Sequence, residues 1–141
     1  MAGRDKYEKR LYYTHMTEVE VELWNRFVDK FPGRFETVDY DFRVGKGIPL
    51  EGGEEEAYIR MGKMLSQKRI DALGWVDEQP TIIEVKRRVG LSTVGQVLGY
   101  ASLFAKEFKH FPVPYLMVVC EMISEDDASV LLDYEVDIEV V

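Results

Sequence analysis

Apolar residues recur at helical spacing in two long segments of the sequence. The first follows Thr17, a residue type suited to cap a helix N-terminus, and stops at "FPGR", where proline and glycine end helices. Its apolar positions are Trp24, Phe27, Val28 and Phe31. The second is "TVGQVLGYASLFAKEF" after a candidate cap at Ser92. Weaker helical patterns cover "EEEAYIRMGKMLS" and "SEDDASVLLDY".

Strand-like patterns fill most of the remaining chain. Residues 35–44 alternate, with Phe35, Thr37, Asp39 and Asp41 opposite Val38, Tyr40, Phe42 and Val44. "RIDALGWV" and "TIIEVKR" are joined by a short turn and predict an antiparallel pair. "PYLMVVCEM" predicts a fully buried strand with a buried thiol at Cys120, and "VDIEVV" a last strand. This order of elements predicts an α/β (α+β) fold, with a mixed central sheet flanked by helices.

Composition and charge narrow the class of protein. The 141 residues suffice for one domain, and 46% apolar with 12% aromatic residues is typical of a globular protein. We expect a soluble intracellular protein with no membrane association, because no apolar run approaches the ~20 residues that span a bilayer. The net charge of −8 weakly disfavours nucleic acid as a partner, but residues 121–141 hold eight acids and no Lys or Arg. The rest of the chain is neutral and locally basic.

Charged residues inside the predicted strands suggest a catalytic site. Glu84 and Lys86 share one face of their strand because they are two residues apart, and the hairpin brings Asp71 alongside. Burying such charges without a partner is costly. Two converging carboxylates form a hard oxygen site suited to Mg²⁺ or Mn²⁺, and a lysine beside it can orient water. Without a metal, Glu84 and Lys86 would be an ion pair on a solvated strand face.

Three further residues fit the same site. Gln96 and Tyr100 are four apart and share one face of their helix. Glu20 is the acid on the apolar stripe of the first helix, with Glu18 and Glu22 as substitutes. Helix surface for Gln96 and Tyr100, and an exposed acid for Glu20, are the simpler alternatives.

The pattern Glu20, Asp71, Glu84-x-Lys86 and Gln96-x-x-x-Tyr100 resembles the PD-(D/E)XK nuclease superfamily. The resemblance is to the branch with a QxxxY helix shared by RecB-type and Cas4 nucleases. Residues 17–141, with "RIDALGW", "IIEVKRRVGLSTVGQVLGY" and "VDIEVV", are most similar to the C-terminal nuclease domain of the NucS/EndoMS mismatch endonucleases. This resemblance implies a restriction-endonuclease-like fold and an Mg²⁺- or Mn²⁺-dependent deoxyribonuclease with a role in DNA repair or recombination.

The resemblance also implies roles for individual residues. Asp71, Glu84 and the backbone carbonyl of Val85 would bind the metal, and Glu20 would hold it through water. Lys86 would position the attacking water, supported by Gln96. Tyr100 would shape the site or contact DNA. Arg87 and Arg88 flank the site and are candidate phosphate contacts or solubilising charges.

The sequence departs from the family pattern at three places, and these departures bear on the expected DNA substrate more than on the expected hydrolysis reaction. The enzymes that it resembles carry an additional N-terminal DNA-binding and dimerisation domain, where this chain has a basic arm over residues 1–16. Ile70 stands in place of the proline of the family motif, and residues 45–68 resemble an insertion into the domain that spans 17–141.

The expected substrate is DNA, cut by a structure-specific endonuclease, with RNA as the other candidate. A non-catalytic module that binds nucleic acid or a protein partner is the alternative function. The apolar residues of the inserted segment predict a two-fold homodimer formed through residues 48–66 or the arm.

Overall fold

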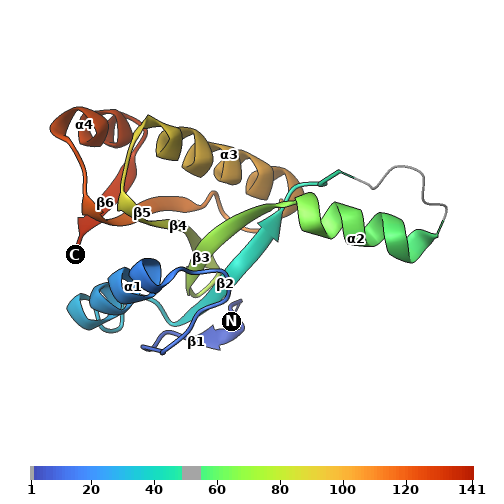
Figure 1. Cartoon of the computed structure of the whole chain (residues 1–141), viewed down its shortest axis with the longest axis horizontal. Helices are drawn as coiled ribbons and strands as arrows, with labels where there is room; N and C mark the ends of the chain where they lie inside the picture. Colours follow the sequence, from blue (N-terminus) through green and yellow to red (C-terminus); the bar gives the residue numbers. More distant parts are fainter. Residues whose placement is uncertain (1, 49–54) are drawn as a thin grey trace.

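A computed structural model describes residues 2–48 and 55–141, which form a six-stranded mixed sheet with helices on both faces (Figure 1). The elements in chain order are β1 (Asp5–Lys6), α1 (Glu18–Lys30), β2 (Thr37–Val44), α2 (Glu56–Ser66), β3 (Lys68–Val76), β4 (Gln79–Arg88), α3 (Leu91–Glu107), β5 (Tyr115–Met122), α4 (Glu125–Asp133) and β6 (Val136–Val140). The strands lie in sequence order across the sheet. This arrangement confirms the predicted α/β class and the mixed sheet.

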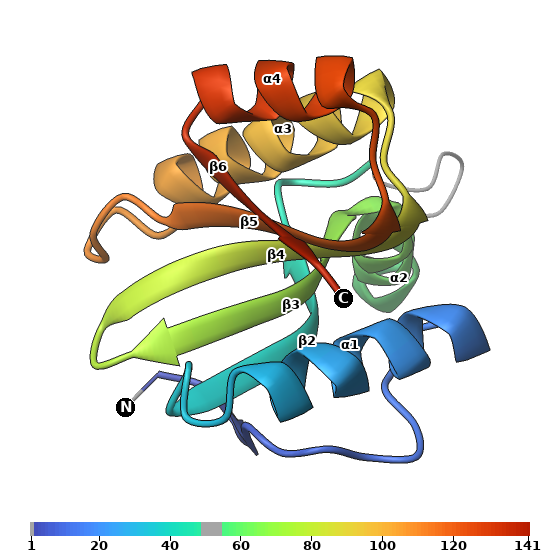
Figure 2. The same ribbon diagram turned by 90° about the vertical axis from the view of Figure 1, so that its left-hand side faces the viewer.

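Strand direction changes in the middle of the sheet. The pairs from β1 to β4 are antiparallel, whereas β4–β5 and β5–β6 are parallel. Parallel neighbours need a crossover, and α3 and α4 provide the two crossovers. Figure 2 shows both crossover helices on one face of the sheet and α1 on the other. The strand predicted from "VDIEVV" is β6, at one edge.

Each face of the sheet has its own core. The α1 face buries Trp24 and Phe27 against Ala72, Ile83 and Val119. The opposite face buries two clusters, one around Phe104 of α3 and one around Leu131 of α4. Cys120 lies buried in the latter cluster, as predicted.

Capping residues explain where the helices begin. Thr17 caps α1 as predicted, in a capping box with Glu20, and Ser124 caps α4. The prediction that Ser92 caps the long helix is wrong. Gly90 is the N-cap of α3, without a side-chain hydrogen bond, so Ser92 lies within the first turn.

The alternation predicted for residues 35–44 is correct only from Thr37 to Tyr40, because Phe35 packs in the same cluster as Val38 and Tyr40. Tyr40 packs on the α1 face, whereas Phe42 and Val44 pack on the α3 face. Asp41 has a φ of 51°, and this left-handed residue reverses the alternation beyond it. The pairing between β2 and β3 skips this position.

The N-terminal arm packs against the body. Its short strand β1 pairs with β2, which the sequence pattern did not predict. Tyr13 is 2% exposed, and its hydroxyl contacts the Asn25 amide oxygen of α1. The arm therefore covers the outer side of the α1 core.

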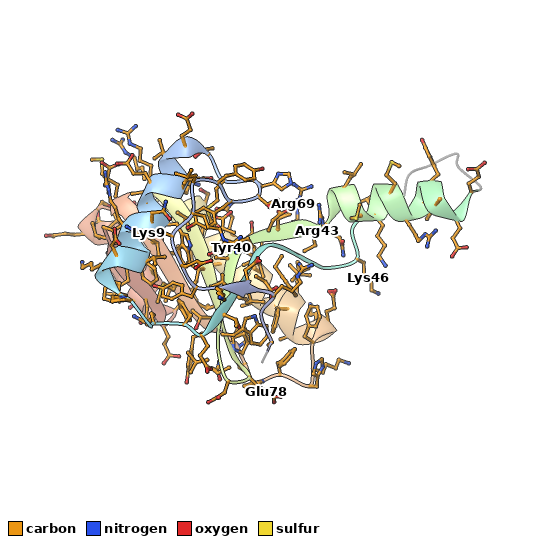
Figure 3. All side chains as sticks on the ribbon, turned by 90° about the horizontal axis from the view of Figure 1, so that it is seen from below. Lys9, Tyr40, Arg43, Lys46, Arg69 and Glu78 are labelled. Carbon is orange, nitrogen blue, oxygen red and sulfur yellow. The ribbon has the colours of Figure 1, made fainter. Side chains whose placement is uncertain are left out.

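α2 projects away from the sheet, as Figure 3 shows. Of its residues, Gly62 alone is buried, and its apolar side chains lie exposed. The exposed set is Tyr58, Ile59, Met61, Met64 and Leu65. Among the described residues, no helix is long and apolar enough to cross a membrane.

Candidate active site

Asp71 and Glu84 lie where the pairing between β3 and β4 stops. The regular register runs from Val76 opposite Gln79 to Ala72 opposite Ile83, and Asp71 is the next residue of β3. There the Val85 N–H donates to Asp71 Oδ2 at 2.9 Å. A side-chain carboxylate thus accepts an N–H of the neighbouring strand, which fixes Asp71 beside Glu84.

Burial perturbs both carboxyl groups. It raises the pKa of Glu84 to about 9, with the negative charge of Asp71 as the next cause and the Lys86 ammonium acting in the opposite direction. Burial likewise raises the pKa of Asp71 to about 6, although the Val85 N–H lowers it. Near neutral pH the pair therefore holds a proton that a bound cation would displace.

One oxygen of this pair has no partner. Glu84 Oε2 is buried and accepts no hydrogen bond from the described part of the chain. A buried polar atom without a partner is costly in a purely structural site. Lys86 lies two residues along the same strand face, partly buried, and no ion pair between described residues includes it.

α3 brings Gln96 and Tyr100 to the same side of the sheet. Gln96 Oε1 is also buried without a hydrogen-bond partner among the described residues. Burial raises the pKa of Tyr100 to about 12, and the charges of Glu84 and Asp71 contribute in the same direction. The charges of both carboxyls thus act on Tyr100, and Gln96, one turn earlier on α3, has an acceptor without a partner among the described residues.

Glu20 approaches from the N-terminal end of α1. Its Oε1 accepts the Thr17 N–H at 3.0 Å, so the residue has a structural role in the capping box. Its negative charge also raises the pKa of both Asp71 and Glu84. Glu20 is partly buried, whereas Glu18 and Glu22 are exposed, so the structure places the stripe acid nearest to the pair.

Arg87 and Arg88 lie at the end of β4 and are exposed. Arg87 Nε pairs with Glu121 Oε2 at 3.2 Å, and an Arg88 nitrogen lies 3.9 Å from the Met122 sulfur. The guanidinium of Arg87 is thus already occupied by an acid of β5.

The sequence reasoning missed one acid next to this site. Asp41 is buried on the strand beside Asp71, and its charge raises the pKa of Asp71. His15, Arg43 and Arg69 surround its carboxylate, with His15 Nε2 at 3.3 Å. Aspartate in the centre of an otherwise apolar strand is the signal that could have identified it.

The donor set fits a hard divalent cation. No group of three or more His, Cys, Asp or Glu side chains is arranged as a metal cage within residues 2–48 and 55–141. Mg²⁺ does not require such a cage, because it is commonly held by one or two carboxylates, with water and substrate phosphate completing the shell. Asp71 and the unpartnered oxygen of Glu84 provide that minimum.

Comparison with known proteins supports the fold. Neither a family model nor a curated protein matches the sequence. Among solved structures, the chain is similar to one described as the crystal structure of a repair endonuclease from Pyrococcus abyssi. The TM-score is 0.50 at 15% identity, over 92% of this chain and 49% of that one. The chain therefore has a nuclease-like fold and spans about half the length of that protein.

Proposed function

We propose that this protein is a metal-dependent nuclease that hydrolyses DNA phosphodiester bonds, acting as a structure-specific endonuclease. The observation that carries the proposal is the buried Asp71–Glu84 pair beside Lys86. The likeness of the fold to a repair endonuclease supports the same class of activity. A module that only binds has no use for two converging carboxyls with an unpartnered oxygen.

The residues of the proposed site would have separate roles in the reaction. Asp71, Glu84 and the Val85 carbonyl would hold Mg²⁺ or Mn²⁺, with Glu20 contributing through water. The bound ion would polarise the phosphoryl oxygen and stabilise the charge that develops on it. Lys86 would orient the attacking water and neutralise negative charge beside the phosphate. Gln96 Oε1 would accept a hydrogen bond from Lys86 or from that water.

DNA is the proposed substrate, contacted by Tyr100, Arg87 and Arg88. Tyr100 is the best candidate of these three, because the charges of both carboxyls act on it. For Arg87 to contact a phosphate, it would have to leave its ion pair with Glu121. The net charge of −8 implies weak general affinity for a polyanion, which is consistent with recognition of a particular DNA structure or with help from a protein partner.

A cleavage assay tests the nuclease proposal. The purified chain should cut supercoiled plasmid or branched and single-stranded oligonucleotides in Mn²⁺ or Mg²⁺, but not in EDTA, with RNA oligonucleotides as a parallel arm. Asp71→Ala, Glu84→Ala and Lys86→Ala should each abolish cutting while keeping the circular dichroism of the folded chain. Wild-type rates from Glu84→Ala would exclude this site. Binding without cleavage on every substrate would favour the non-catalytic module.

A two-fold homodimer through residues 55–66 of the predicted interface is also proposed. Residues 49–54 of the predicted range lie outside the described structure. An isolated helix of 11 residues is only marginally stable in water, yet Gly62 is the one residue that α2 buries against its own chain. A second copy of α2 would cover its exposed apolar side chains, whereas the arm is already packed on the body. Sedimentation should give twice the 16.4 kDa chain mass, and a monomer mass would refute the dimer.

A further inference from the structure

Thr93 has a buried hydroxyl without a partner in the first turn of α3. The residue is 0% exposed, and its Oγ1 makes no hydrogen bond with any residue that the structure describes. A threonine inside a helix commonly donates its hydroxyl hydrogen to a carbonyl of the preceding turn. Thr93 forms no such bond within the described part of the chain. An unpartnered buried hydroxyl is costly in a purely structural position, so this hydroxyl calls for another explanation.

The buried face of α3 is apolar apart from Thr93. Its other buried residues are Val94, Val97 and Phe104. Valine has the same branched shape as threonine and would fill the position of Thr93 without burying a polar group. The hydroxyl therefore lies where packing alone favours a methyl group.

Lys86 of β4 lies on the sheet face that α3 covers. Its register partner on β5 is Cys120, which packs in one cluster with Val94 of α3. Paired residues of neighbouring strands project to the same side of a sheet. Lys86 is partly buried there, and none of the ion pairs between described residues includes it. Thr93, the residue before Val94, therefore faces the part of the sheet that carries Lys86.

The direction of α3 gives the level at which the helix and the sheet meet. β4 and β5 are parallel, so the helix that connects them runs antiparallel to both strands. Phe104, late in α3, packs in one cluster with Ile82, early in β4. Residues at the start of α3 thus lie over the end of β4. This arrangement brings Thr93 to the level of Lys86, four positions beyond Ile82.

The polar atoms between α3 and this face are complementary. Glu84 Oε2, Gln96 Oε1 and Thr93 Oγ1 are buried and have no hydrogen-bond partner among the described residues. A lysine ammonium has three N–H donors and no acceptor. Lys86 is the lysine that shares the strand face of Glu84. In the proposed reaction Glu84 binds the cation, which leaves Gln96 and Thr93 as acceptors for Lys86.

We propose that Thr93 is a positioning residue for Lys86, whose ammonium donates to Thr93 Oγ1 when a divalent cation occupies the carboxylate pair. Without a cation, the ammonium and the carboxylate of Glu84 attract each other, which leaves Thr93 Oγ1 free as observed. A cation between Asp71 and Glu84 repels the ammonium, and Thr93 and Gln96 then hold it beside the site. The inference rests on the proposed nuclease function and adds a residue that touches neither the cation nor DNA.

Two substitutions separate the hydroxyl of Thr93 from its packing. Thr93→Val keeps the branched shape and removes the hydroxyl, so it should lower kcat for DNA cleavage about tenfold with little change in KM. Thr93→Ser keeps the hydroxyl and loses a methyl group, so it should retain most of the wild-type kcat. The control is Thr81→Val, at a buried threonine near the other end of β4, which should cut as wild type does.

NMR relaxation of isotope-labelled lysine side chains tests the contact without cleavage. In the absence of DNA, adding Mg²⁺ should order the Lys86 side chain of wild type and of Thr93→Ser. In Thr93→Val, the Lys86 side chain should stay as mobile as it is in EDTA. Lys106, in the last turn of α3, is the internal control and should respond to Mg²⁺ in none of the three proteins.

Stability in EDTA should change in the opposite direction to activity. Thr93→Val replaces an unpartnered buried hydroxyl by a methyl group, so it should raise the urea midpoint of the cation-free chain. A higher midpoint together with a lower kcat is the result expected of a positioning residue. A threonine that serves only packing would give the higher midpoint with an unchanged kcat.

Four results would overturn the role of Thr93. These are a wild-type kcat in Thr93→Val, equal losses of kcat in the valine and serine variants, a lower urea midpoint of Thr93→Val in EDTA, and ordering of Lys86 by Mg²⁺ in Thr93→Val. Cleavage by wild type is scored separately. If wild type cuts no DNA, the nuclease proposal fails, and the relaxation of Lys86 still decides whether Thr93 holds it.

Discussion

Helices α1 and α2 have similar amphipathic sequences but opposite surroundings. α1 buries Leu23, Trp24, Phe27 and Val28 and begins with a capping box. α2 buries only Gly62 and begins without a side-chain cap. The comparison shows that an apolar stripe indicates that a helix packs against a partner, but it does not indicate whether the same chain provides that partner. α1 has its partner in the sheet, whereas α2 would find its partner in a second copy of the chain in the proposed homodimer.

Truncation of an apolar side chain should give the largest difference in unfolding free energy between the two helices. Trp24→Ala removes a fully buried ring and the hydrogen bond from its Nε1 to the Tyr40 hydroxyl, at a cost of about 3–5 kcal/mol in unfolding free energy. Met61→Ala in α2 should change the unfolding free energy of the monomer by less than about 0.5 kcal/mol. Urea titration of both variants, at a protein concentration at which the chain is monomeric, measures the difference in unfolding free energy. Similar losses would show that α2 packs on its own chain.

The carboxyl pair of β3 and β4, which Glu20 of α1 approaches, should make stability depend on pH in the absence of metal. Burial raises the pKa of Glu84 in the folded chain to about 9. The stability that the protonated carboxyl contributes is therefore fully present below the pKa of Glu84 in the unfolded chain, and it is lost as the pH rises towards 9. Glu84→Gln removes this loss and should stabilise the chain by about 1–3 kcal/mol at pH 8 in EDTA, but not at pH 4. Thermal melts at the two pH values measure it. A destabilised variant at pH 8 would mean that the ionised carboxylate is satisfied.

Acids on α1 should differ in their effect on cleavage. Glu20→Gln should slow cutting about tenfold, which corresponds to ~1.4 kcal/mol, because its charge reaches both site carboxyls. The exposed neighbours provide matched controls, and Glu18→Gln and Glu22→Gln should leave the rate within twofold. Initial rates in Mn²⁺ decide the point. Three equal effects would mean that α1 contributes no residue to the site.

Removal of the N-cap side chains should give the smallest difference in unfolding free energy between the two helices. Thr17→Ala removes the side-chain oxygen that accepts the Glu20 N–H and should cost about 1 kcal/mol. Glu55→Ala at the N-cap of α2 should cost only a few tenths, because that side chain makes no capping hydrogen bond. Equilibrium unfolding of the two single variants compares them. A larger loss at Glu55 would reverse the contrast between the helices.

Local patterns predicted the elements of the fold because most of them are locally encoded. Thr17 and Ser124 cap helices through bonds to residues three positions away, and the hairpin of β3 and β4 is set by a short turn. The two-residue β1 is too short to carry a pattern and depends on pairing with β2. The reversal at Asp41 depends on one backbone angle, and aspartate does not require a positive φ.

The carboxylate site was easier to predict from the sequence than the lysine-lined cavity between α2 and the end of α3. Asp71, Glu84 and Lys86 lie on one hairpin, so strand periodicity and a turn are enough to bring them together. The lysines that line this cavity, Lys46, Lys63, Lys68 and Lys106, come from the loop after β2, from α2, from β3 and from α3. Their convergence depends on where α2 stands relative to α3, and no periodicity in the sequence encodes that position.

The turn between β3 and β4 sets how the site tolerates insertions. Val76 pairs with Gln79, so only Asp77 and Glu78 separate the strands, and this spacing places Asp71 opposite the Glu84 level. One extra residue in the turn would shift the register and set Asp71 against Ile83, because a single-residue slip exchanges the two faces of a strand. An exposed turn far from the carboxylates is therefore less free to change length than the longer connection between β2 and β3, across which the strands pair independently of loop length.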